Sequence, residues 1–109
     1  MKDVEMKNVF VWGLVLAMSS SVADEVAAGR AKADVACALC HGPQGIASLP
    51  SAPNLAGQSA IYVREQLQNY RNGKRHNEVM SLIAKPLTDL EIAQLAAWYS
   101  AIKLTVEIP

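Results

Sequence analysis

The sequence Cys37-Ala38-Leu39-Cys40-His41 governs the interpretation of the whole chain. Two cysteines three positions apart, with a histidine directly after the second, form the attachment signature of a c-type haem. On one helical turn the two sulfurs and the imidazole stand at i, i+3 and i+4, so they project from the same face. The same five residues also allow a Cys37–Cys40 disulfide, a thioredoxin-like redox pair or part of a zinc site.

The first 23 residues have the composition of a secretory signal peptide. Residues 8–23 carry no charge, their apolar centre at 9–18 reads VFVWGLVLAM, and small residues follow at Ser21 and Ala23. We expect cleavage after Ala23 and a periplasmic product, with translation starting at Met1 or Met6. An uncleaved anchor is disfavoured, because the uncharged run is shorter than the ~20 residues of a membrane-spanning helix. Residues 24–109 then form a single domain.

The predicted mature domain has equal numbers of basic and acidic side chains. The whole chain has 10 of each, and removing residues 1–23 takes two from each total. This balance argues against a nucleic-acid partner. A domain this small usually needs a covalent or metal staple, and two exported cysteines do not persist as free thiols. Because His41 and His76 are the only histidines, a zinc site is disfavoured. A disulfide or a haem remains.

Three helices are predicted in the mature domain, and no β-strand pattern is present. Alanine-rich sequence favours a first helix over 25–37. A second is expected over 59–72, with Ser59 as its N-cap and Gly73 as its stop. A third follows over 88–102, where Thr88 and Glu91 form a capping box. The fold class is therefore all-α. The residues expected at buried helical positions are Tyr62, Val63, Leu67, Tyr70, Ile92, Leu95, Ala96, Tyr99 and Ile102.

The connections between these helices differ in character. Residues 42–57 contain three glycines and three prolines and are predicted to form a long loop. Residues 78–84 form a short apolar turn that contains Met80. For Tyr62 and Tyr70 we favour ordinary core packing, and a position bordering the cofactor is the alternative.

A haem bound through His41 leaves one face of the iron to another ligand, for which Met80 is the best candidate. It is the one methionine outside the predicted signal peptide, and it lies 39 positions after His41. That length of chain can pass around the macrocycle to its far side. His76 is the competitor, but its polar neighbours indicate exposure. Without a haem, Met80 is a flexible core residue.

Basic residues are concentrated between the second helix and the third. Residues 64–85 contain five basic and two acidic side chains, a net charge of +3. A haem brings two propionates, and carboxylates removed from water require partners. Arg71 and Arg75 are candidates for that role, with a solvated charged surface as the alternative.

These pieces, in this order, resemble the class I c-type cytochromes. The similarity is greatest to short bacterial single-haem members and to one half of the two-haem bacterial cytochromes c. It covers nearly all of residues 25–103. The matching segments are CALCHG at 37–42, PNLAGQ at 53–58, Tyr62, QLQNYRNGKR at 66–75, Met80 and LTDLEIAQLAAWYSAI at 87–102.

The resemblance implies a cytochrome c fold, with three main helices around a covalently bound haem. The first and last helices are expected to cross where Gly29 approaches Leu95 and Trp98. The implied site is one haem c attached through Cys37 and Cys40, axial ligands His41 and Met80, and the Pro53 carbonyl facing the His41 imidazole.

The predicted function is that of an exported monohaem carrier that shuttles single electrons between redox proteins by Fe(II)/Fe(III) cycling. The chain is not expected to be an enzyme, nor to keep a transmembrane segment, and it should act as a monomer or in transient complexes. The alternative is a haem subunit permanently docked in a periplasmic dehydrogenase or oxidase. A haem-free thiol-disulfide protein is the third interpretation, which the mass of the exported chain excludes if a haem adduct is present.

Overall fold

A computed structural model of the chain describes residues 7–8, 10–17 and 19–109, and the expected start at Met1 or Met6 lies outside this range. Across these residues the structure is helical and contains no strand, which confirms the predicted all-α class. No helix in the described part is long and apolar enough to cross a membrane. The five helices are α1 Val22–Ala36, α2 Ala38–His41, α3 Ala60–Asn72, α4 Met80–Ala84 and α5 Asp89–Ala101.

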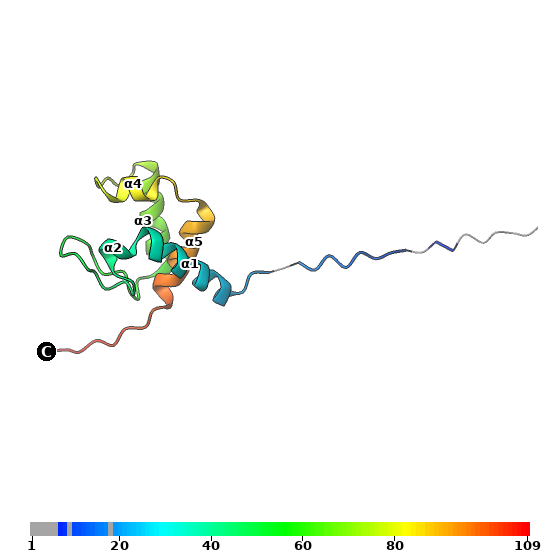
Figure 1. Cartoon of the computed structure of the whole chain (residues 1–109), viewed down its shortest axis with the longest axis horizontal. Helices are drawn as coiled ribbons and strands as arrows, with labels where there is room; N and C mark the ends of the chain where they lie inside the picture. The colour runs from blue at the N-terminus through cyan, green and yellow to red at the C-terminus, as the bar shows by residue number, and fades with distance from the viewer. Residues whose placement is uncertain (1–6, 9, 18) are drawn as a thin grey trace, which may run out of the picture.

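The crossing of α1 with α5 is the main helix pairing of the domain (Figure 1). Gly29 stands at the crossing, where an added Cβ would overlap the backbone carbonyl of Gln94 and lie 2.9 Å from the Trp98 Cβ. The crossing was predicted at Leu95 and Trp98. The structure confirms the approach to Trp98 and adds the Gln94 backbone as the closest contact, while the contact with Leu95 stays a prediction.

The core of the domain is small. The buried apolar residues in the described chain are Ala33, Ala56, Val63, Ala84, Leu87, Ile92, Leu95, Ala96 and Tyr99. Leu67 and Tyr70 of α3 are half-buried and pack against this core. Tyr62 is 46% exposed, so its predicted place in the buried stripe of α3 is wrong. It lies one position, about 100° around the helix, from Val63.

The helix ends largely follow their sequence signals. Ser59 accepts from the Tyr62 N–H at 3.5 Å, and Gly73 adopts the left-handed conformation after α3 with φ of 85°. Thr88 and Glu91 form the predicted capping box of α5. The first helix was expected from Glu25, but α1 begins at Val22 because Ser21 forms a second capping box with Asp24.

Residues 10–17 are exposed and lie outside the helical domain (Figure 1). The boundary predicted after Ala23 therefore falls within the first turn of α1. The helical domain proper runs from α1 to α5, and the chain then continues as an exposed C-terminal segment.

Candidate functional site

The first cysteine of the CxxCH sequence lies at the junction of two helices. Cys37 ends α1, and its N–H donates to the Ala33 carbonyl at 2.8 Å. Its own carbonyl accepts from the N–H groups of Cys40 and His41 at 3.3 and 3.0 Å. The predicted turn is therefore present as the four-residue α2, after a change of backbone direction at Cys37. The thiols of Cys37 and Cys40 are half-buried, and neither forms a disulfide in the described residues.

His41 is buried and fixed by a hydrogen bond. Its side chain is the buried polar group of the core, 6% exposed, and Nδ1 lies 2.8 Å from the Pro53 carbonyl oxygen. Because a carbonyl can only accept, Nδ1 carries the proton and Nε2 keeps a free lone pair. This is the contact expected of Pro53, and it is the geometry found around histidines that bind metals.

The loop that supplies Pro53 is held at both ends. The Gly45 carbonyl accepts from the N–H groups of Leu55 and Ala56 at 2.7 and 3.0 Å. The Gly57 N–H donates to the Tyr99 carbonyl at 2.9 Å, which ties the end of the loop to α5. Gly45 has φ of 75°, and a side chain there would press on Ala56. The predicted loop is thus an ordered support for His41, a role that glycine and proline content alone did not reveal.

Met80 begins α4 and is half-buried. Its N–H donates to the Asn77 side-chain carbonyl at 2.9 Å, and the Val79 N–H donates to the same oxygen at 3.0 Å. This Asn77 bridge orients the first turn of α4 and was not predicted from the sequence. His76 is exposed, so burial favours Met80 over its competitor.

The two candidate arginines have partners within the protein. Arg71 donates to the Leu87 carbonyl at 3.0 Å and pairs with Asp89 at 2.6 Å. Arg75 donates to the Gln66 side chain at 2.9 Å, and its guanidinium lies 4.7 Å from the centre of the Tyr70 ring. Arg71 therefore connects α3 to the start of α5. Pairing of either arginine with a propionate stays a prediction.

The donor set of this region fits a haem. Two free thiols can form thioether bonds, and the free Nε2 of His41 can bind iron. Met80, at the start of α4, adds a thioether elsewhere in the domain. Three apolar side chains that pack against the core, Leu55, Leu67 and Tyr70, are only half-buried.

Two buried polar atoms, Trp98 Nε1 and Tyr99 Oη, have no hydrogen-bond partner in the described residues, and the sequence analysis did not identify them. No sequence pattern marks these two atoms, and they can be recognised only from their burial in the folded chain.

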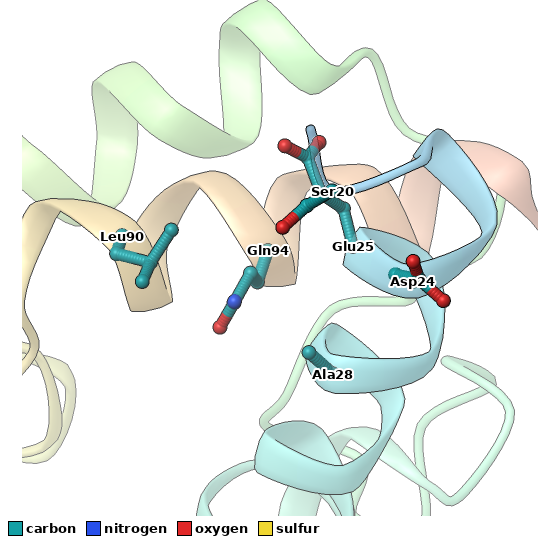
Figure 2. Close-up of a pocket in the computed structure, with 6 residues that line it drawn as sticks. All are labelled: Ser20, Asp24, Glu25, Ala28, Leu90 and Gln94. Atoms are coloured by element: carbon teal, nitrogen blue, oxygen red, sulfur yellow. The ribbon is translucent and has the colours of Figure 1, made fainter. Parts of the chain in front are cut away.

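A separate hollow of about 250 Å³ lies between the start of α1 and α5, and Figure 2 shows it. Its carboxylates belong to Asp24 and Glu25, and no cysteine or histidine lines it. Leu90 and Gln94 of α5 form the opposite wall. The hollow therefore shares no residue with the CxxCH site, and it offers none of the nitrogen or sulfur donors found there.

Comparison with protein families identifies the fold. A family model described as Cytochrome c matches residues 26–102. The chain belongs to the cytochrome c family. This cytochrome has the predicted fold class and the predicted cofactor, a covalently attached haem c, which confirms the resemblance to class I c-type cytochromes.

Individual relatives show how much of a longer protein the chain corresponds to. It is 48% identical over 73 residues to cytochrome c4 of Thiocapsa roseopersicina, covering 67% of this chain and 38% of that protein. It is 40% identical over 82 residues to cytochrome c-554(548) of Halomonas halodenitrificans, covering 72% and 98%. It is 36% identical over 106 residues to a thiosulfate dehydrogenase electron acceptor of Stutzerimonas stutzeri, and this match covers 93% of this chain and 49% of that protein.

Among solved structures, reduced recombinant cytochrome c4 from Pseudomonas stutzeri superposes with a TM-score of 0.66 at 27% identity. The match covers 72% of this chain and 48% of that one. The chain thus spans about two-fifths of the length of the cytochrome c4 relatives, and nearly all of the length of cytochrome c-554(548).

Proposed function

We propose that this cytochrome is a single-electron carrier with one haem c at the CxxCH site. Cys37 and Cys40 would hold the haem through thioether bonds, and His41 and Met80 would bind its iron. The bound haem supplies an iron that alternates between Fe(II) and Fe(III). The observation that best supports the proposal is the 2.8 Å contact between His41 Nδ1 and the Pro53 carbonyl, because it leaves Nε2 free to bind iron.

The protein's contribution is to hold the two ligands still and to set their donor strength. Donation from Nδ1 to Pro53 makes the His41 imidazole a stronger ligand. The soft sulfur of Met80 favours ferrous iron and raises the potential relative to a second imidazole. Both ligands lie on short helices whose turns are fixed by hydrogen bonds. Electron gain and loss therefore need little rearrangement of the chain, which performs no bond-making chemistry of its own.

Three further assignments belong to the same proposal. Residues 1–23 act as a cleaved export signal that delivers the carrier to the periplasm, which the exposed segment 10–17 supports. The partners are redox proteins met by a monomer in transient complexes. Arg71 and Arg75 are assigned to the propionates, and each would then share its guanidinium with the protein partners described above.

A second candidate function is that of a haem subunit docked in a dehydrogenase or oxidase complex. Relatives described as thiosulfate dehydrogenase electron acceptors favour it, one of which aligns with 93% of this chain. So do three exposed apolar side chains on the segments of the site, Leu39, Val79 and Leu82, with exposed fractions of 88%, 58% and 71%. Freely diffusing electron carriers bind their partners through small interfaces, so a large exposed apolar surface beside the site favours the docked form. Co-purification of a stoichiometric partner from cells would favour the docked form.

The mass of the exported protein after denaturation tests the haem assignment. We expect a chain that begins at Asp24 and carries one haem adduct, because thioether bonds survive unfolding. A chain without the adduct contradicts the proposal, and a different first residue contradicts the cleavage site alone. The double substitution Cys37→Ala with Cys40→Ala is the control and should carry no haem adduct after denaturation.

The visible spectrum tests the axial assignment. Wild-type ferric protein should show the weak long-wavelength band of a sulfur–iron bond. Met80→Ala should abolish it, because Met80 is the only methionine of the predicted mature chain. His76→Ala is the matched control and should leave the band intact. The assignment of Met80 is wrong if the band is absent from the wild type or survives in Met80→Ala.

A further inference from the structure

Tyr99 presents a buried hydroxyl that the fold leaves without a partner. The residue is 2% exposed, and its Oη is among the buried polar atoms that make no hydrogen bond in the described structure. Its backbone, in contrast, is fully engaged, because the Tyr99 carbonyl accepts from Gly57 and Ile102 at 2.9 and 3.3 Å. A buried polar group without a hydrogen-bond partner destabilises the folded state. The unpartnered Tyr99 hydroxyl therefore indicates that it gains a hydrogen-bond partner in the functional protein.

Cys37 supplies a sulfur atom in the same core cluster as this hydroxyl. Cys37 packs against the core cluster that contains Tyr99. Burial raises the pKa of the Cys37 thiol, and the nearby Tyr99 hydroxyl partly opposes that rise. Burial, and then Cys37, raise the pKa of Tyr99 well above its usual range. The two groups influence each other, yet the free thiol and the hydroxyl do not make a hydrogen bond of full geometry.

The chemistry of attachment changes what Cys37 can offer. A thiol has both a weak donor and a weak acceptor, whereas a thioether sulfur only accepts. Tyr99 stays protonated because its pKa is raised, so it remains a donor across the physiological range. Once Cys37 is a thioether, the pair consists of one buried donor and one buried acceptor.

We propose that the Tyr99 hydroxyl donates a hydrogen bond to the Cys37 sulfur in the haem-loaded protein and thereby raises the reduction potential. The inference rests on the proposed attachment of haem at Cys37. A hydrogen bond to a sulfur substituent withdraws electron density from the macrocycle edge. The ferrous state has more density to lose and is stabilised more, as hydrogen bonds to ligand sulfurs do elsewhere. Tyr99 is then a positioning residue that acts on the potential through Cys37.

The holoprotein with Tyr99→Phe tests the proposal, because phenylalanine keeps the ring and removes only the hydroxyl. We expect the ferrous-to-ferric ratio at a fixed ambient potential to fall about threefold, the effect of a fraction of one hydrogen bond. The carbon–sulfur stretching band in resonance Raman spectra should shift as well. Ser100→Ala is the matched control: it removes a hydroxyl from the adjacent position of α5, where Ser100 is exposed and donates to the Ala97 carbonyl at 3.2 Å, and it should move neither signal.

The outcomes separate this inference from the haem assignment itself. A denatured mass without haem overturns both. A haem adduct together with an unchanged potential and an unchanged carbon–sulfur band in Tyr99→Phe overturns the role of Tyr99 alone, and indicates that a buried water takes the hydrogen bond. If Tyr99→Phe does not fold, proton NMR of the reduced wild type decides. A slowly exchanging hydroxyl proton close to the Cys37 β-protons supports the proposal, and its absence overturns it.

Discussion

At the residue scale, Gly29 determines how closely the two terminal helices can pack. A methyl group there would overlap the Gln94 carbonyl, which is backbone and cannot turn away. We expect Gly29→Ala to destabilise the domain by about 1–3 kcal/mol through overpacking, although alanine favours helix by about 1 kcal/mol. Urea unfolding of the holoprotein measures the change.

Exposed Ala31 on the same helix provides the control for this substitution. Ala31→Ser should cost less than ~1 kcal/mol, because only helix propensity changes. A Gly29→Ala protein as stable as the wild type would mean that the helices separate at the crossing without penalty.

Individual residues also show where sequence reasoning stops. The CxxCH sequence and the Pro53–His41 contact could be predicted, since both depend on a motif and on a resemblance that fixes the order of the segments. The partners of Arg71 could not, because Leu87 and Asp89 lie 16 and 18 positions away. Nothing in a local pattern indicates such a pairing. The orphan hydroxyl of Tyr99 is a property of packing, and no sequence signal marks it.

At the scale of helices, the ion pair of Lys32 with Glu91 connects α1 to α5 at 2.6 Å. The Lys32 ammonium, followed by the Thr88 backbone N–H, lowers the pKa of Glu91 below its ordinary value of 4.5. A carboxylate whose pKa is lowered by folding stabilises the native state above its unfolded pKa. That contribution is lost as the pH falls through the folded pKa. The relevant window therefore lies below pH 4.5.

Glu91→Gln isolates this charge, because glutamine can still accept the Thr88 N–H of the capping box. We expect a small change in melting temperature at neutral pH, since exposed ion pairs contribute little. Between neutral pH and pH 3 the variant should lose less stability than the wild type, and added salt should narrow the difference. Parallel acid dependence in the two proteins would show that the pair has no energetic role.

Helix ends were predictable where their signals are local. Ser59, Gly73 and the Thr88–Glu91 box each act within four residues, and the structure confirms all of them. The start of α1 is not predicted from the sequence, because Ser21 is interpreted as part of the export signal and not as an N-cap. Tyr62 was misplaced for a different reason: hydrophobic spacing identifies a face, but it does not distinguish a residue at the edge of that face.

At the scale of the whole molecule, the described chain buries few large side chains. Ile92 and Leu95 are its largest fully buried residues, and domains of this size rarely reach useful stability from such a core alone. Leu55, Leu67 and Tyr70 pack against the core but are only half-buried, and we expect a bound haem to cover part of this apolar surface. The sequence predicted this need for a staple from length alone, although it could not show which surfaces remain open.

The double substitution Cys37→Ala with Cys40→Ala removes covalent attachment and tests this dependence. We expect lower helix content by circular dichroism and a broad, weakly cooperative melt, because the apolar surfaces lose their cover. Leu39→Ala lies on the same turn but is a control, since Leu39 is 88% exposed. It should melt as the wild type does. A cooperative melt of the double variant at wild-type temperature contradicts the role of haem as a staple.

The pairing of α1 with α5 has a consequence for synthesis. The two helices that pack most closely are separated by almost the entire domain, so α1 has no packing partner until α5 has also been synthesised. Contacts between such distant segments form late and slowly. Cys37 and Cys40, which follow α1 directly, should therefore stay accessible for haem attachment until α5 docks.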